Sequence, residues 1–396
     1  MKWSSTVSNK ESLEEALISC TSQIKEQLGG EQGDVAVVFV SHHFAGEYDR
    51  VPSIIREHLG NILVFGCSAG GVIGGSREVE HSPGVSLTVA SLPGVDVKAF
   101  HLVGSDIPDQ DASPSRWEEA LGVPAEDSPY FMLVADPYSF PAQAFIEGID
   151  YAYRGSTKIG GLASGGQQPG QNVLFLGDEV HRLGAIGLAL KGNIVVDTVV
   201  AQGCRPIGEL MCITESSNNM LVALDERPPL EVLKEIFVRS SERDQSLMQN
   251  SLFLGIVMDD FIDNPQQGDF LIRNVMGVDS QGGSIAIGEM LREGQRVQFH
   301  LRDAITSAED LSALLVRYAE EERATTTSGA LLFSCLGRGE YLYGRPDHDT
   351  GLFTDALGYV PLGGFFCNGE IGPVAGSTYL HGYTSSFGIF RPLSGE

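Results

Sequence analysis

The sequence lacks any apolar run that approaches the roughly 18 residues needed for a membrane-spanning helix. Its first residues, MKWSSTVSNKESLEEAL, also lack the apolar segment that forms the centre of a secretory signal peptide. These two absences predict a cytoplasmic protein without membrane insertion.

Basic residues are scarce, with 26 Lys and Arg against 52 Asp and Glu, which gives a formal net charge of −26. Nucleic-acid affinity depends on Lys and Arg side chains that neutralise phosphates, so this acidic chain is not expected to bind nucleic acid. Attraction to anionic membranes is disfavoured for the same reason.

The six cysteines include no C-x-x-C pair, so a zinc or thioredoxin-like site has no support, and we expect reduced, buried thiols. His42 and His43 have no partner at ligand spacing, which favours a loop or strand-end role. Asp259 and Asp260 lack the spacing of a calcium loop, and neither a P-loop nor a strand–GxGxxG–helix unit occurs. The sequence therefore predicts no metal and no cofactor.

Glycine, by contrast, is abundant. The chain has 48 glycines in 396 residues, about 12% against an average of about 7%. No collagen period is present, so the glycines are expected at tight turns and at close approaches of the backbone.

Many of these glycines punctuate a unit that occurs three times, read as strand, helix, strand, Gly-rich loop and return strand. The distances from strand start to the first loop glycine are 31, 30 and 33 residues. The opening strands are 35–40, 130–135 and 330–335; the loops begin at Gly66, Gly160 and Gly363; the return strands are 85–90, 184–190 and 383–390.

A different pattern lies between the second and third copies. A helix is predicted after Pro228 and Pro229, four strand-like segments follow, and a capping box at Thr306–Glu309 predicts a further helix. The whole chain is therefore predicted to be mixed α/β, with mixed sheets flanked by helices in two domains. We expect these domains to be 1–225 and 226–396.

The segment Gly66–Gly70 matches G-x-S-x-G, the pattern of a nucleophile elbow around Ser68. An elbow needs a helix immediately afterwards, and Gly71–Gly75 is poor helix sequence. The corresponding loops of the other copies carry Ser164 and Asn368 instead. Shared glycines with changing polar residues favour a shared backbone geometry; phosphate binding by the loop remains an alternative.

The C-terminal segment is the richest in polar chemistry. Asn368, Glu370 and His381 among glycines offer a donor, an anion and a titratable base, which together can hold an amino or carboxyl group. Two alternatives remain open: Glu370 and His381 hold the loop, or Cys367 and His381 form a nucleophile–base pair.

Arg338 follows the third opening strand, at the end of the strand where α/β sheets commonly bind ligands. Its guanidinium could bind a carboxylate through two hydrogen bonds. A surface ion pair is the alternative.

These residues resemble the FIST family. The segment 64–71 with 84–87 resembles the FIST N-terminal domain, and 271–279, 332–339 and above all 361–373 with 381–384 resemble the FIST C-terminal domain. The resemblance spans about residues 20–390. It implies a sensory domain that binds small ligands, with amino acids as a proposed class, often joined to a signalling output or an F-box. This chain has no room for an output domain, so a separate signalling partner is expected.

The leading hypothesis is thus a small-ligand-binding sensory protein with no catalytic residues. The alternatives are a hydrolase-like enzyme that uses Cys367 or Ser68 as nucleophile, and a protein-binding scaffold. The predicted ligand-binding residues are Cys67, Ser68, Ser164, Arg338, Cys367, Asn368, Glu370 and His381.

Overall fold

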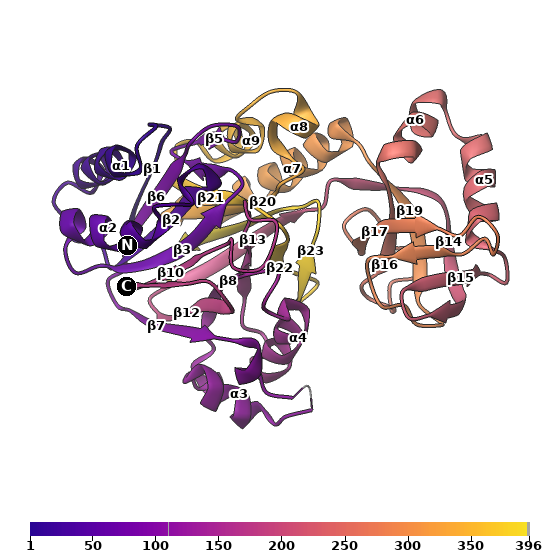
Figure 1. Cartoon of the computed structure of the whole chain (residues 1–396), viewed down its shortest axis with the longest axis horizontal. Helices are drawn as coiled ribbons and strands as arrows, with labels where there is room; N and C mark the ends of the chain where they lie inside the picture. The colour runs from indigo at the N-terminus through magenta and orange to yellow at the C-terminus, as the bar shows by residue number, and fades with distance from the viewer. Residues whose placement is uncertain (110, 394–396) are drawn as a thin grey trace. The chain divides into compact units, whose positions relative to one another are not determined.

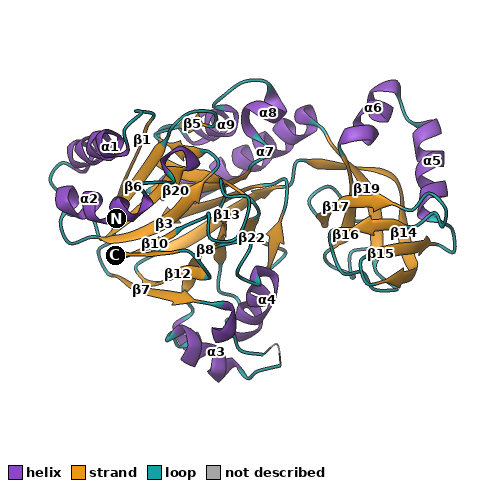
Figure 2. Ribbon diagram, viewed as in Figure 1, coloured by secondary structure: helices purple, strands orange, loops and turns teal. Residues whose placement is uncertain are grey.

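A computed structural model of the chain describes residues 1–109 and 111–393, and it forms two compact units (Figure 1). The first comprises Met1–Val200, Ser312–Leu380 and the segment from Thr384 onward; the second comprises Ala201–Leu311 and His381–Tyr383. The predicted mixed α/β class is confirmed, with mixed sheets flanked by helices (Figure 2). The two compact units divide the chain at other positions than residue 225. The predicted domains 1–225 and 226–396 rest on sequence patterns and stay a prediction.

The threefold repeat builds three six-stranded sheets in the first unit, each around one parallel pair of strands with an antiparallel return strand beside it. The parallel pairs are β2 (Val35–Ser41) with β3 (Leu63–Ala69), β8 (Tyr130–Ala135) with β9 (Lys158–Leu162), and β20 (Gly329–Cys335) with β21 (Leu362–Cys367). The return strands are β6 (Val85–Ser91), β12 (Ala185–Gly192) and β24 (Ser385–Arg391).

Each copy also contributes a short hairpin to the sheet of another copy, so each sheet contains strands from two copies. The hairpin β4 (Val72–Gly74)–β5 (Arg77–Val79) joins β21, β10 (Leu174–Leu176)–β11 (Glu179–His181) joins β3, and β22 (Glu370–Val374)–β23 (Ser377–His381) joins β9. The strands β1 (Lys2–Ser8), β7 (Val95–Leu102) and β13 (Val195–Ala201) complete the three sheets at one edge.

The glycines that were predicted to lie in loops after the second strand lie within that strand, which corrects the sequence interpretation. Gly66, Gly160 and Gly364 have φ values of 152°, 150° and 149°. A Cβ on each would stand 1.7, 1.8 and 1.9 Å from a carbonyl oxygen of the neighbouring parallel strand. The three positions are thus equivalent, and the match in the third copy is Gly364 rather than Gly363.

The inner faces of the three sheets enclose one shared apolar core. In it the ring of Phe365 stacks on Phe39 at 4.4 Å and meets Phe333 edge-on at 5.9 Å. Helices cover the outer faces, which explains why the opening strands are apolar on both sides. These helices are α1 (Leu13–Leu28) and α2 (Val51–Leu59) on the first sheet, α3 (Pro114–Leu121) and α4 (Ala142–Ala152) on the second, and α9 (His348–Leu357) on the third.

The second unit is a closed barrel in the order β14-β15-β18-β17-β16-β19. Its strands are β14 (Cys204–Ser217), β15 (Met220–Leu224), β16 (Leu252–Val257), β17 (Phe270–Val278), β18 (Ile285–Ile287) and β19 (Arg296–Arg302), with helices α5 (Pro229–Arg239) and α6 (Glu242–Asn250).

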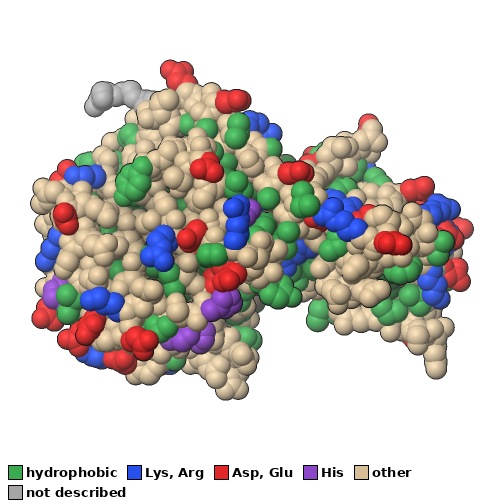
Figure 3. All heavy atoms as spheres, turned by 90° about the horizontal axis from the view of Figure 1, so that it is seen from above, with side chains coloured by type: hydrophobic (Ala, Val, Ile, Leu, Met, Phe, Trp, Pro, Cys, Tyr) green, Lys and Arg blue, Asp and Glu red, His purple; other side chains and the backbone are tan. Residues whose placement is uncertain are grey.

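The capping box predicted at Thr306–Glu309 is wrong. Helix α7 (Ala304–Ala319) begins earlier, because the Asp303 carboxylate accepts a hydrogen bond from the Ile305 amide at 2.9 Å. Helix α8 (Gly339–Tyr343) completes the elements used below. Of the helices in the described residues, none is both long and apolar enough to cross a membrane. On the face drawn in Figure 3, Lys and Arg side chains are interspersed with Asp and Glu.

Candidate functional site

The three glycine-containing strands end at one junction, where the copies hydrogen-bond to one another. The Ser164 amide donates to the Ser68 carbonyl at 3.3 Å, and the Asn368 amide donates to the Leu162 carbonyl at 3.1 Å. These two bonds join equivalent positions, because each donor stands four residues after its copy's positive-φ glycine and each acceptor two residues after it.

The third link of this junction is made by a side chain. The Ser164 hydroxyl accepts a hydrogen bond from the Gly70 amide at 2.8 Å and donates one to the Phe366 carbonyl. It therefore bridges the two backbone groups that would bond directly if the junction were symmetric. The equivalent backbone groups therefore bond directly between copies one and two and between copies two and three, whereas between copies one and three the Ser164 hydroxyl stands between them.

A cavity of about 320 Å³ opens at the side of the junction where copies one and three meet. This volume is at the lower end of the range for small-molecule sites, about 300–1,000 Å³. Its lining comes from the ends of β2, β3, β20 and β21 and from the segment after β5, and consists of His42, His43, Gly70, Gly71, Glu80, His81, Leu336 and Phe366.

Two histidines enter the cavity directly after β2, in agreement with the predicted strand-end role. The rings of His42 and His43 lie 4.2 Å apart. Burial, and then the neighbouring His43, lower the pKa of His42 below its usual value. A neutral imidazole at His42 can both donate and accept a hydrogen bond.

Glu80 supplies a carboxylate to the same cavity. Its Oε1 accepts a hydrogen bond from the Glu340 amide at 2.8 Å, at the start of α8. Burial raises the pKa of Glu80 above its usual value. Gly339 has a φ of +62°, and a Cβ there would stand 2.4 Å from Glu80 Oε1, so only glycine lets the two segments approach this closely.

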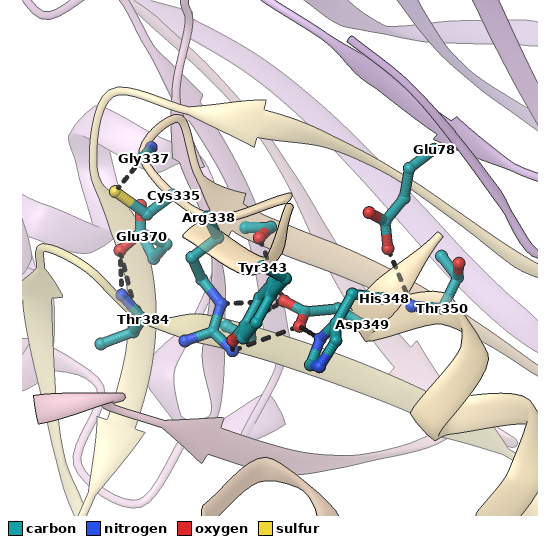
Figure 4. Close-up of polar contacts among 12 residues, drawn as sticks. Glu78, Cys335, Gly337, Arg338, Tyr343, His348, Asp349, Thr350, Glu370 and Thr384 are labelled. Atoms are coloured by element: carbon teal, nitrogen blue, oxygen red, sulfur yellow. Dashed lines mark hydrogen bonds and ion pairs between the residues drawn. The ribbon is translucent and has the colours of Figure 1, made fainter. Parts of the chain in front are cut away.

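A buried ionic network joins the segment between β20 and α8 to α9 (Figure 4). Arg338 Nε lies 2.8 Å from Asp349 Oδ2, and Arg338 Nη2 donates to the Tyr343 hydroxyl at 2.6 Å. Burial opposes ionisation of Asp349, but the Arg338 charge and hydrogen bonds from His348 and Ser385 outweigh it and lower its pKa. An anionic ligand at Arg338 would have to compete with Asp349, so the ligand role of Arg338 stays a prediction.

Glu78 links β5 to α9 beside this network. Its Oε1 accepts from the Thr350 amide at 2.9 Å, and its own amide donates to Asp347 Oδ1 at 2.6 Å. Burial, with the added charge of Asp349, raises the pKa of Glu78 to about 8. The carboxyl group points into protein rather than into the cavity lining.

The predicted nucleophiles Cys367 and Ser68, and the predicted ligand residue Cys67, lie inside the protein. Cys67 and Cys367 are fully buried, and burial raises the pKa of both thiols well above the usual value. The Ser68 hydroxyl accepts from the Val173 amide at 3.1 Å and donates to the Asn172 side-chain oxygen at 3.4 Å, which is not a base. None of the three lines the cavity.

The remaining predicted ligand residues are distributed over separate places. Asn368 is exposed at the junction, where its amide nitrogen donates to the Ala163 carbonyl at 3.0 Å. Glu370 is fully buried and its Oε2 accepts from the amide of Thr384 at 3.1 Å and from its hydroxyl at 2.8 Å. His381 is buried and falls in the second compact unit.

Of the predicted ligand residues, Ser164 thus contacts two residues that line the cavity, Gly70 and Phe366, whereas Asn368 lies where the second and third copies meet. The cavity itself contains four polar residues that the sequence did not predict as ligand residues. These are His42, His43, Glu80 and His81. A polar pair immediately after an apolar strand could have identified the histidines, whereas nothing local marks Glu80. Within the described residues, no group of three or more His, Cys, Asp and Glu is placed to hold a metal ion.

Comparison with known proteins matches residues 34–227 to the FIST N domain and residues 229–373 to the FIST C domain. An uncharacterised protein of Mycobacterium tuberculosis is 36% identical over 384 residues, or 97% of this chain and 98% of that protein. An F-box/LRR-repeat protein of Arabidopsis thaliana is 21% identical over 326 residues, or 73% of this chain and 61% of that protein. A cyanuric acid hydrolase structure from A. caulinodans aligns over 99% of this chain and 100% of its own, but with a TM-score of 0.37 and 8% identity it carries no argument.

Proposed function

Because this chain belongs to the FIST family, whose domains are associated with signalling, we propose that it is a sensory protein that binds a small ligand in the cavity beside the Ser164–Gly70 junction. The observation that carries the proposal is the composition of that cavity. It combines a partly buried carboxylate, three imidazoles and two apolar side chains in one space.

This combination suits an amino acid or a related metabolite. An ammonium group would bind the Glu80 carboxylate, and a carboxylate group would accept hydrogen bonds from His43 and His81. Leu336 and Phe366 provide apolar surface for a side chain.

Glu80 also offers a route by which ligand binding could change the protein surface. Glu80 holds the start of α8 through the Glu340 amide. A ligand ammonium group that draws the carboxylate into the cavity weakens this bond and changes the position of α8 at the protein surface. A separate signalling protein would then read that change, since the output depends on differential contacts in the two states.

The enzyme alternative is less well supported by the geometry. A cysteine nucleophile acts as the thiolate, and burial raises the thiol pKa of both Cys67 and Cys367. Ser68 faces an amide oxygen rather than a general base.

The test is thermal unfolding of the purified chain against a library of amino acids and common metabolites, with hits measured by calorimetry. A ligand at about 100 times its Kd stabilises the protein by about 2.7 kcal/mol, which is readily measured. Glu80→Gln should weaken a true hit about tenfold or more, the effect of losing a charge-assisted hydrogen bond. The matched control is Glu57→Gln, on the exposed side of α2, which should leave affinity unchanged.

Two outcomes would count against the site. If a hit binds Glu80→Gln as tightly as the unmodified chain but loses affinity in Glu370→Gln, the ligand lies at the cluster predicted from the sequence. If no compound shifts the unfolding temperature, and mass spectrometry finds no ligand retained through purification, the result would favour a protein-binding scaffold over a sensor.

A further inference from the structure

The barrel unit contains a second and larger cavity, of about 680 Å³, between β14 and α5. It arises where β14 leaves its regular pairing with β19. Ile207 pairs with Phe299 and Met211 with Val297, so residues 208–210 stand opposite a single residue of β19. Bulges of this kind occur preferentially next to binding sites and redirect side chains there.

A glycine allows this bulge to press against the helix. Gly208 has a φ of +67°, and a Cβ there would stand 2.6 Å from Ile236 Cδ1. The strand therefore touches α5 at Gly208, and the neighbouring strand residues Ile207, Glu209 and Met211 line the cavity.

One stripe of α5 faces this cavity, with Val232, Glu235, Ile236 and Arg239 at helical spacings of three and four. Val232 is 5% exposed and packs with Ile207 and the partly buried Met211 in the barrel core. The floor of the cavity is thus apolar and its rim is charged.

The charges on the rim are only partly compensated. Arg227 pairs with Glu235 at 2.5 Å, and Asp244 pairs with Arg205. Glu209 and Arg239 are exposed, line the same cavity, and have no hydrogen-bond or ion-pair partner among the described residues. One carboxylate and one guanidinium therefore remain for a ligand.

We propose that this cavity is a further binding site, for an aliphatic molecule with an ammonium group at one end and a carboxylate at the other. Glu209 binds the ammonium group, Arg239 binds the carboxylate, and the hydrocarbon part covers Val232, Ile236 and Met211. Short aliphatic peptides and ω-amino acids share this chemistry. An α-amino acid does not, because both of its charges lie at one end.

Calorimetric titration of the full chain with 6-aminohexanoate and with trileucine tests the proposal and separates the two sources. At least one of them should bind at concentrations up to about 10 mM. Hexylamine and hexanoate, which each lack one charge, should bind about tenfold more weakly than 6-aminohexanoate. Binding of trileucine alone identifies peptides as the ligand class, and binding of 6-aminohexanoate alone identifies ω-amino acids.

Glu209→Gln and Arg239→Gln should each weaken binding of the active probe about fivefold or more. Glu231→Gln, also exposed on α5 but outside the cavity, is the control and should bind normally. Circular dichroism confirms that the variants fold. Absence of binding by both probes, or binding that neither variant changes, overturns the proposal. Glu80→Gln should leave binding intact, so failure here is distinguishable from failure of the proposed sensory site.

Discussion

Arg338 and Asp349 form an ion pair that is closed to solvent on both sides, with Nε 2.8 Å from Oδ2 and side-chain exposures of 0% and 2%. The carboxylate also accepts hydrogen bonds from Ser334 on β20 and Ser385 on β24, at 3.4 and 2.5 Å. Because Asp349 belongs to α9, the pair fastens this helix and the α8 loop to the third sheet. Two charges can be buried in this way only when each supplies the other's missing hydration.

Removal of the cation should therefore be costly. Arg338→Met leaves Asp349 buried without its counter-charge and should lower the free energy of unfolding by about 3–5 kcal/mol. Denaturant unfolding measures this change. Arg345→Met, at an exposed arginine of the same segment, should change stability by less than about 0.5 kcal/mol. Equal effects of the two substitutions would show that the pair contributes no special stability.

Two glycines of the third copy, Gly364 in β21 and Gly351 in α9, should respond to alanine substitution with opposite changes in stability. Gly364→Ala would place a Cβ 1.9 Å from the Leu332 carbonyl oxygen at a φ of 149°, so it should destabilise the fold by at least about 2 kcal/mol. Gly351→Ala, in the interior of α9 with nothing within 4 Å of its Cβ, should be neutral or stabilise by up to about 1 kcal/mol. Chemical denaturation of both variants measures the difference, and a tolerated Gly364→Ala would contradict the close strand approach.

The sequence predicted the strands that are apolar on both faces, such as 35–40 and 330–335, because burial on both sides leaves a continuous apolar run. It could not predict the hairpins, since strands as short as 72–74 and 77–79 carry no measurable alternation and pair with a sheet from a distant copy. The glycine segments were interpreted as loops because the strained φ of Gly364 depends on a neighbouring strand, which no local pattern records.

The candidate site likewise depends on contacts between segments that are distant in the sequence. His42 and Glu80 come from different segments and meet only because the β4–β5 hairpin crosses to the third sheet. The burial of Arg338 could not be predicted either. Its partner Asp349 belongs to a different helix, and the spacing between the two residues matches no sequence motif. Ser164 and Asn368 were noted as polar residues of the Gly-rich segments, and the structure shows that they occupy equivalent places, four residues after Gly160 and Gly364.

Thiol reactivity should follow burial. Cys67 and Cys367 are enclosed, while Cys212 and Cys335 are partly exposed. Iodoacetamide should therefore modify Cys212 and Cys335 in the native protein, and the two enclosed thiols only after unfolding. Peptide mass spectrometry of native and denatured samples measures each site. Fast modification of Cys367 in the native protein would contradict this prediction and favour an enzyme that uses Cys367 as nucleophile.

His300 should make the barrel unit sensitive to acid. Burial lowers the pKa of His300 to about 4, from an ordinary value of 6.5. Between these values the unfolded chain binds a proton that the folded chain does not, so this histidine lowers stability as pH falls through the window, by up to about 1.4 kcal/mol per pH unit. His300→Asn should flatten that part of the stability profile, measured by denaturant unfolding at several pH values. An unchanged slope would mean that His300 does not titrate there.

Glu78 should act in the opposite direction. Its pKa is raised to about 8, first by burial and then by Asp349. The charge of Glu80, directly after β5, adds to this effect, while Arg338 is paired with Asp349. The folded chain thus keeps a proton that the unfolded chain releases above the ordinary pKa of 4.5, so this group's contribution to stability falls as pH rises from about 4.5 to about 8.

Glu78→Gln keeps an oxygen that can accept from the Thr350 amide but removes the titration. The stability of this variant relative to the unmodified protein should therefore increase with pH across that window, by at least about 1.4 kcal/mol, the equivalent of one pKa unit. Unfolding at pH values on both sides of the window measures the difference, and Glu57→Gln, at an exposed position, should show none. A difference that stays constant with pH would mean that Glu78 is ionised in the folded protein like an ordinary surface carboxylate, and that the β5–α9 contact is held by a charge rather than by a protonated acid.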